Sequence, residues 1–71
     1  MQERDCYPGR RVVISLPGHH ELKGTIVEVL PFQYRGRGAR IVVQCDEHQG
    51  SEYSNTRREF HCDELRPLEA R

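Results

Sequence analysis

Short runs of alternating apolar and polar residues, bounded by glycine and proline, recur along this chain. In residues 12–16 every second side chain is aliphatic, which places three aliphatic side chains on one face of an extended segment. Residues 25–30 are rich in β-branched side chains and precede Pro31, which cannot donate a hydrogen bond to a sheet. We predict a strand in each run, with residues 19–22 as a polar connection between them.

A loop and a third strand are predicted after Pro31. Residues 32–39 contain two glycines among arginines, a composition typical of a loop. Residues 40–45 alternate again, and one face of this segment is formed by Ile41, Val43 and Cys45. We predict a third strand over residues 40–45 and a turn over residues 46–50.

The last third of the chain predicts one more strand, a helical turn and a short edge strand. Residues 52–60 contain two large apolar residues, Tyr53 and Phe60, and we predict the fourth strand there, with Phe60 in the core. The acidic residues in 62–65 favour a single helical turn, and residues 66–68 predict a last strand at an edge.

These elements predict an all-β fold, because no segment has apolar residues at helical spacing over three turns. A five-stranded sheet left open would expose two edges, and curling into a barrel removes most of that exposure. We therefore expect a five-stranded barrel over residues 8–68 with a short helical turn before the last strand. Residues 1–7 are predicted to be a flexible N-terminus and residues 69–71 a C-terminal tail.

Composition and charge narrow the function. A 71-residue chain forms one domain that buries only about 60% of its unfolded surface, which leaves little room for a substrate cavity. Eleven basic residues balance eleven acidic ones, so any electrostatic attraction to a partner must be local. We expect a cytoplasmic, monomeric protein that is not an enzyme, binds no cofactor and does not associate with membranes.

Two stretches resemble known families. Residues 8–14 (PGRRVVI) and 23–31 (KGTIVEVLP) resemble a KOW-type motif, in which a turn glycine precedes the first strand and a second glycine, here Gly24, opens the next. The absence of a side chain at Gly24 allows the bend that a tight barrel needs. Residues 55–65 (NTRREFHCDEL) resemble the ending of the photosystem I E-type protein family and of the variable chain of ferredoxin-thioredoxin reductase.

These resemblances imply one fold, an SH3-like barrel, but two kinds of partner. KOW-containing proteins often meet RNA or ribonucleoprotein. The other two families dock onto protein assemblies. The resemblances therefore imply a non-catalytic binding module and leave two partner classes open.

An arginine-rich loop is the strongest candidate binding site. Guanidinium groups bind phosphates, and a tyrosine ring can stack on an unpaired base. Residues 34–40 (YRGRGAR) contain no acidic residue, and a second basic arm follows later in the chain. The predicted site for nucleic acid or ribonucleoprotein consists of Tyr34, Arg35, Arg37, Arg40, Arg57 and Arg58. The alternative interpretation is an ordinary solvated loop.

A protein-docking module or small accessory subunit of a larger enzyme or electron-transfer complex is the alternative function. Acidic residues gather beyond the arginine loop, at Asp46, Glu47, Glu52, Glu59, Asp63, Glu64 and Glu69. Such a polar surface suits docking onto a complementary protein. Aromatic residues that could line a peptide groove are Phe32, Tyr34, Tyr53 and Phe60.

The cysteines and histidines are weaker candidates for chemistry. Cys45 and His48 have the spacing of a zinc-binding loop. His61 and Cys62, however, point to opposite faces of an extended strand, and Cys45 alternates with apolar residues as a buried side chain does. The three cysteines lack a CxxC pair, which favours reduced thiols. We predict neither a metal site nor a catalytic cysteine.

Overall fold

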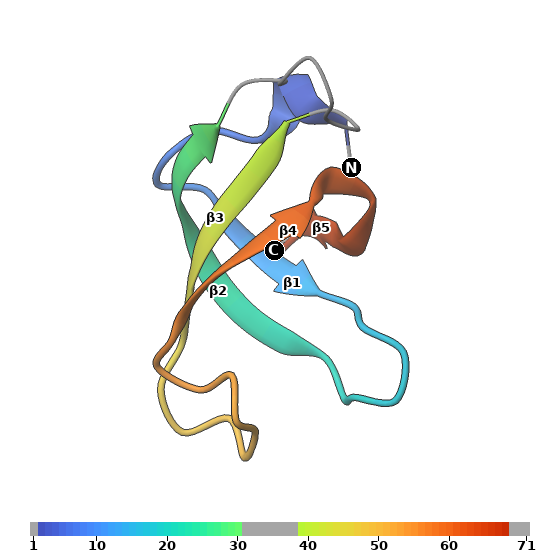
Figure 1. The fold of residues 1–71 in the computed structure, drawn as a ribbon, viewed down its shortest axis with the longest axis vertical. Coiled ribbons are helices and arrows are strands. Elements are labelled where there is room, and N and C mark those ends of the chain that lie inside the picture. The colour runs from blue at the N-terminus through green and yellow to red at the C-terminus, as the bar shows by residue number, and fades with distance from the viewer. Residues whose placement is uncertain (1, 31–38, 69–71) are drawn as a thin grey trace.

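The computed structural model of the protein describes residues 2–30 and 39–68. Its strands form one antiparallel sheet in the order β4-β3-β2-β1-β5 (Figure 1). The strands are β1 (Arg11–Ile14), β2 (Leu22–Leu30), β3 (Arg40–Cys45), β4 (Arg57–His61) and β5 (Leu65–Pro67). A 3-10 turn, η1 (Glu3–Asp5), precedes the sheet, and a second, η2 (Cys62–Glu64), joins β4 to β5. The predicted all-β class and the helical turn before the last strand are confirmed.

One face of the sheet supplies the hydrophobic core. The side chains of a strand alternate between its two faces, so every second residue contributes. The largest fully buried side chains are Ile14, Leu22, Ile26, Ile41, Val12, Val43 and Cys45. Phe60 of β4 and Leu65 of β5 close the core at the two edge strands. The predicted shared face of β3 and the core position of Phe60 are confirmed.

The boundaries of β1 and β2 differ from the prediction. Leu22, predicted to lie in a polar connection, is fully buried and pairs with Ile14 as the first residue of β2. A single leucine next to polar residues gives no periodic signal, and its position is set by pairing with β1. Strand β1 in turn ends at Ile14, while Leu16, predicted to extend it, is partly buried against the core.

Strand β4 is shorter than the predicted strand over 52–60. Residues 46–56 form one long connection between β3 and β4, so the predicted turn over 46–50 continues to the start of β4. His48 and Asn55 have φ values of 59° and 57°, and this left-handed conformation interrupts an extended strand. The Thr56 hydroxyl donates to the Tyr53 carbonyl at 2.5 Å, which closes the turn before β4.

Gly24 is required by close packing of two strands and not by a bend. It faces Cys45 across the β2–β3 pair, and a Cβ atom there would lie 2.6 Å from Val43 Cγ1 and 2.8 Å from the Gln44 carbonyl oxygen. The irregularity in β2 comes later, where the register shifts between Ile26 and Glu28. Such a bulge bends a strand and increases its twist.

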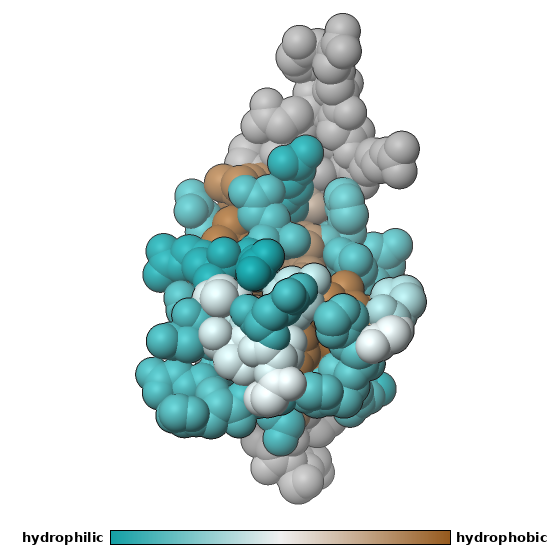
Figure 2. Space-filling model, turned by 60° about the horizontal axis from the view of Figure 1, so that its bottom comes forward, coloured by the Kyte–Doolittle hydropathy of each residue, from teal (hydrophilic) through white to brown (hydrophobic). Residues whose placement is uncertain are grey.

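The two edge strands are β4 and β5. Among the described residues they are not hydrogen-bonded neighbours, so closure of the sheet into a barrel stays a prediction. The face turned forward in Figure 2 is largely hydrophilic, and its apolar areas are small and separated. In the described ranges no helix is long and apolar enough to cross a membrane.

Candidate functional site

The arginine-rich segment is joined to the sheet at one end of the β2–β3 pair, where Leu30 faces Arg40. We call this end, with the N-terminal residues that lie beside it, the loop end. Three of the predicted site residues, Tyr34, Arg35 and Arg37, lie outside the described residues. Since Leu30 and Arg40 are partners, the chain leaves and rejoins the sheet at neighbouring positions.

Arg40 is the predicted site residue that the structure describes at the loop end. Its side chain is exposed, and its Nη1 atom lies 3.2 Å from Glu59 Oε1. Both residues line a pocket of about 210 Å³ together with Phe60 and His61. An exposed ion pair of this kind contributes little to stability. Arg40 can therefore exchange the carboxylate for a phosphate at small cost.

Arg57 and Arg58 lie at the other end of the β3–β4 ladder. Arg40 pairs with His61, whereas Arg57 pairs with Gln44, four residues further along β3. At 3.2–3.4 Å per residue these positions are separated by about 13 Å. Arg57 and Arg58 also point to opposite faces of β4. The structure thus does not bring them beside Arg40 as one cluster.

The N-terminal segment also lies at the loop end, a position that the sequence pattern did not predict. Gly9 N–H donates to the Ile26 carbonyl at 2.7 Å, and Ile26 N–H donates to the Arg10 carbonyl at 2.9 Å. These bonds extend the β1–β2 pairing, and Cys6 is buried in the core just before them. Figure 1 shows η1 beside the end of β2 and the start of β3. This segment contains Arg4, Tyr7 and Arg10.

Tyr7 and Arg10 form an exposed aromatic and cationic pair. Tyr7 is 52% exposed and is the one exposed large hydrophobic residue among those described. The Arg10 guanidinium carbon lies 5.4 Å from the centroid of the Tyr7 ring, and Arg10 Nη1 donates to the Asp5 carbonyl at 3.0 Å. The stretch YPGRR carried the available signal, because an aromatic residue there meets a turn and two arginines.

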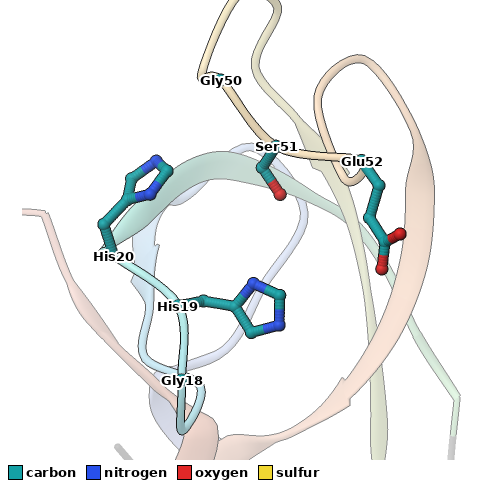
Figure 3. A pocket seen from close by; sticks show the side chains of 6 residues that line it. All are labelled: Gly18, His19, His20, Gly50, Ser51 and Glu52. Carbon is teal, nitrogen blue, oxygen red and sulfur yellow. The ribbon is translucent and has the colours of Figure 1, made fainter.

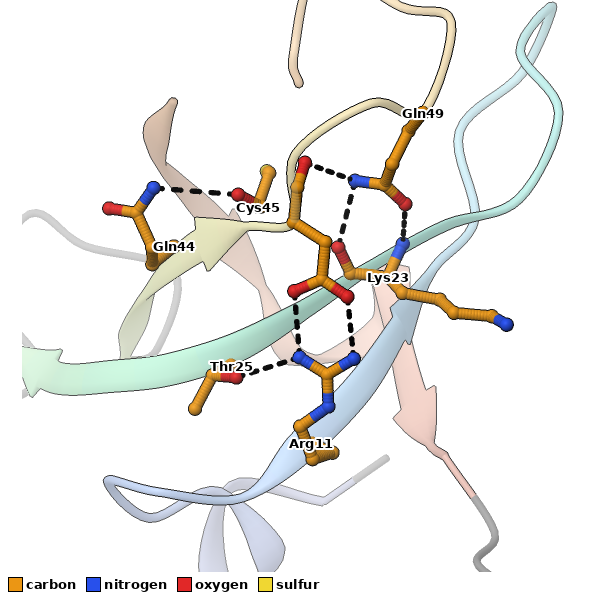
Figure 4. Close-up of polar contacts among 7 residues, drawn as sticks. Arg11, Lys23, Thr25, Gln44, Cys45 and Gln49 are labelled. Carbon is orange, nitrogen blue, oxygen red and sulfur yellow. Dashed lines mark hydrogen bonds and ion pairs between the residues drawn. The ribbon is translucent and has the colours of Figure 1, made fainter. Parts of the chain in front are cut away.

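The basic residues of the described chain differ in how far their charge is already neutralised. Arg11 binds both carboxylate oxygens of Asp46, at 2.7 and 2.5 Å (Figure 4), and Arg66 forms an ion pair with Glu21. The Arg11 guanidinium lowers the pKa of the Asp46 carboxyl by hydrogen bonding to it. Arg4 and Arg10 form no ion pair with any described carboxylate. Their charge therefore remains available at the loop end.

A second pocket lies between the β1–β2 and β3–β4 connections, away from the loop end. It has a volume of about 350 Å³ and is lined by Gly18, His19, His20, Gly50, Ser51 and Glu52 (Figure 3). The two connections are joined there, because His20 Nε2 is hydrogen-bonded to the Gln49 carbonyl at 2.7 Å. His19 meets Tyr53 edge to face, with ring centroids 5.3 Å apart, and the Arg58 guanidinium lies 4.7 Å from the Tyr53 centroid.

The cysteines form no described metal site. Cys45 is 1% exposed, and burial raises the pKa of its thiol, as it raises the pKa of Cys6. The interpretation of Cys45 as a small buried side chain is confirmed. Within the described ranges, no group of three or more histidine, cysteine, aspartate or glutamate residues is placed to hold a metal ion.

Comparison with protein-family models, with curated proteins and with solved structures finds no match to this chain. The resemblances to KOW-type barrels and to the two protein-docking families therefore stay predictions from sequence. Any function assigned to the chain rests on its own residues and geometry.

Proposed function

We propose that the protein is a non-catalytic, SH3-like binding module that holds nucleic acid or ribonucleoprotein at its loop end. The observation that carries this proposal is the meeting of two basic stretches distant in the sequence. Arg4 and Arg10 lie beside the end of β2, where the segment containing Arg35 and Arg37 leaves the sheet. The exposed Tyr7 ring adds an apolar contact among these charges.

The chemistry of these residues fits a phosphate backbone. Arginine presents a planar fork of N–H donors that matches phosphate oxygens, and it stays charged at all physiological pH values. The net charge of the chain is zero, so attraction depends on the local arrangement and not on the whole protein. Three to five phosphate contacts would give a slope of log K against log salt of about −2 to −3.5 on a single strand.

Matched removal of positive charge at the two ends of the sheet tests the proposal. The loop-end variant is Arg35→Ala/Arg37→Ala/Arg40→Ala, and the control is Arg57→Ala/Arg58→Ala at the far end of the β3–β4 ladder. We expect the wild-type protein to bind labelled oligonucleotides at low salt, and the loop-end variant to bind more weakly with a flatter salt dependence. The control variant keeps most of the affinity.

Two results would overturn this assignment. If neither single-stranded nor duplex oligonucleotides bind at low salt, nucleic acid is not the ligand. If they bind and the loop-end variant retains wild-type affinity, the loop end is not the site. Circular dichroism of each variant verifies that the sheet is intact, which we expect because Arg40, Arg57 and Arg58 lie outside the buried core.

The open edge of β4 favours a second candidate function, docking of a protein strand. Cys45 N–H donates to the Thr56 carbonyl, and the antiparallel alternation then directs the backbone groups of Arg57 and Glu59 away from β3. An extended segment of another protein can add to such an edge. This alternative predicts a protein partner that remains bound after nuclease treatment and is lost when Glu59 is replaced by proline.

A further inference from the structure

We infer that the Tyr7 ring is a platform on which an unpaired base stacks, so that the ligand of the loop end is single-stranded nucleic acid and not duplex. This inference rests on the proposed function and names its ligand class. The shared chemistry is a base with a free π face on a phosphate backbone, and both RNA and single-stranded DNA supply it.

Tyr7 differs from the other described ring of its type. Tyr53 is half-buried, with the edge of His19 on one side and the Arg58 guanidinium over its ring. Tyr7 is 52% exposed, and its ring contact is with Arg10 alone among the described residues. Tyr53 therefore packs two connections together, whereas Tyr7 presents aromatic surface to solvent.

The backbone around Tyr7 is fixed by its neighbours. Pro8 has a restricted φ and also limits the conformations of the residue before it. Arg10 N–H donates to the Tyr7 carbonyl at 3.1 Å, Gly9 adopts a φ of 95°, and the two bonds to Ile26 hold this turn against β2. On the other side, Cys6 is anchored in the core. Little conformational freedom of the Tyr7 backbone is left to lose when a ligand binds.

Arg10 prepares the same surface for a nucleotide. Its guanidinium is held by the Asp5 carbonyl, at 3.0 Å, and lies by the Tyr7 ring with no ion pair to a described carboxylate. A base stacked on the exposed part of the ring would bring its own phosphate close to this charge. Aromatic ring and cation together provide the two contacts that sequence-tolerant single-strand binding uses.

Duplex nucleic acid does not offer the ring an equivalent partner. The bases of a helix are stacked on one another, and their faces are not free except at ends, bulges and loops. Loss of one stacked base by substitution of the aromatic residue typically lowers affinity on the order of 10- to 100-fold. The expected signature is a large effect of Tyr7 on single strands and little effect on duplexes.

Substitutions at Tyr7 test the inference. Tyr7→Phe keeps the ring, Tyr7→Leu keeps an apolar side chain without a π face, and both are measured with a single strand and with a blunt duplex of equal length. We expect Tyr7→Phe to bind single strands within about threefold of wild type, and Tyr7→Leu to lose about 10- to 100-fold. Duplex affinity changes by less than about twofold in both variants.

A spectroscopic readout separates stacking from other effects of the substitution. The chain contains no tryptophan, so Tyr7→Trp introduces a single reporter at the proposed platform. Its fluorescence is quenched when a base stacks on it, and we expect this with single-stranded RNA or DNA and not with duplex. Parallel RNA and DNA titrations identify which of the two sources is preferred.

The outcomes distinguish the inference from the proposed function. If Tyr7→Leu binds single strands as tightly as wild type, or the indole of the Tyr7→Trp variant is not quenched at saturation, the stacking inference is wrong while nucleic-acid binding stands. If duplex binding falls as much as single-strand binding, the platform is not selective and the inference is also wrong. If no nucleic acid binds the wild-type protein, both fail.

Discussion

The side chain of Gln49 is hydrogen-bonded to both backbone groups of Lys23. Its Nε2 donates to the Lys23 carbonyl at 2.9 Å, and its Oε1 accepts from the Lys23 N–H at 2.5 Å (Figure 4). The amide thereby imitates the backbone of a paired strand, and a further bond to the Asp46 carbonyl at 3.0 Å ties it to the end of β3. The long 46–56 connection is held to β2 by this one side chain.

Replacement of Gln49 by alanine is therefore expected to loosen the 46–56 connection. Lost hydrogen bonds of this kind contribute about 0.5–1.5 kcal/mol each, so we expect a loss of about 1–3 kcal/mol in the free energy of unfolding. Urea unfolding and hydrogen exchange of the connection measure the effect. Gln44→Ala is the control, because the Gln44 amide makes a weaker contact of 3.4 Å to the Cys45 carbonyl. Equal losses in the two variants would contradict this role of Gln49.

The ion pair between Arg11 and Asp46 predicts a pH-dependent contribution to stability. Arg11 lowers the pKa of Asp46 in the folded state, so the contribution is present above the unfolded pKa of about 3.9 and is lost as pH falls through the folded pKa. Both side chains are more than one third exposed, so Asp46→Asn costs only about 0.5–1 kcal/mol at pH 7. Thermal unfolding of both proteins from pH 7 to pH 3 measures the difference, which is expected to shrink below about pH 4. A difference that grows on acidification would contradict the assignment.

Gly24→Ala tests the close approach of β2 to β3. The added methyl would meet the Gln44 carbonyl oxygen at 2.8 Å, and backbone in a central strand moves less readily than a side chain. We expect a loss of about 1–3 kcal/mol, as for other overpacked cores. If the variant unfolds at the wild-type urea concentration, the strands tolerate the methyl and the packing role of Gly24 is wrong.

Thiol reactivity distinguishes the three cysteines. Cys6 and Cys45 are buried, and their raised pKa values lower the fraction of reactive thiolate, whereas Cys62 is only partly buried. We expect an aromatic disulfide reagent to modify one thiol per native molecule rapidly and all three after unfolding. Cys62→Ser removes the rapid phase. Rapid modification of this variant would show that another thiol is accessible in the native state.

Sequence predicted the fold best where alternation was strong. The bounds of β3, Arg40–Cys45, were predicted correctly because apolar and polar residues alternate without interruption. Prediction failed where tertiary pairing decides: Leu22 has no apolar neighbour at period two on its N-terminal side, yet it pairs with Ile14. The fourth strand was predicted too long because residues such as Asn55 adopt left-handed φ values that composition only suggests.

The candidate site was less accessible to sequence reasoning than the fold. Arginines near one another in the sequence suggested a patch, but register determines that Arg57 lies about four residues along the ladder from Arg40. Tyr7 and Arg10 were overlooked because the segment before the first strand lacks periodicity. Their position depends on backbone bonds to Ile26, sixteen or more residues away, which no local pattern encodes.

Two-dimensional amide NMR of the labelled 71-residue protein, titrated with a single-stranded oligonucleotide at low salt, tests the central claim most directly. If the loop end binds nucleic acid, the largest shift changes occur at Tyr7, Gly9, Arg10 and Arg40, and resonances of the 46–56 connection move little. If the ligand causes no shifts, or the largest changes map to His19, Ser51 and Arg58, the proposed interface is contradicted.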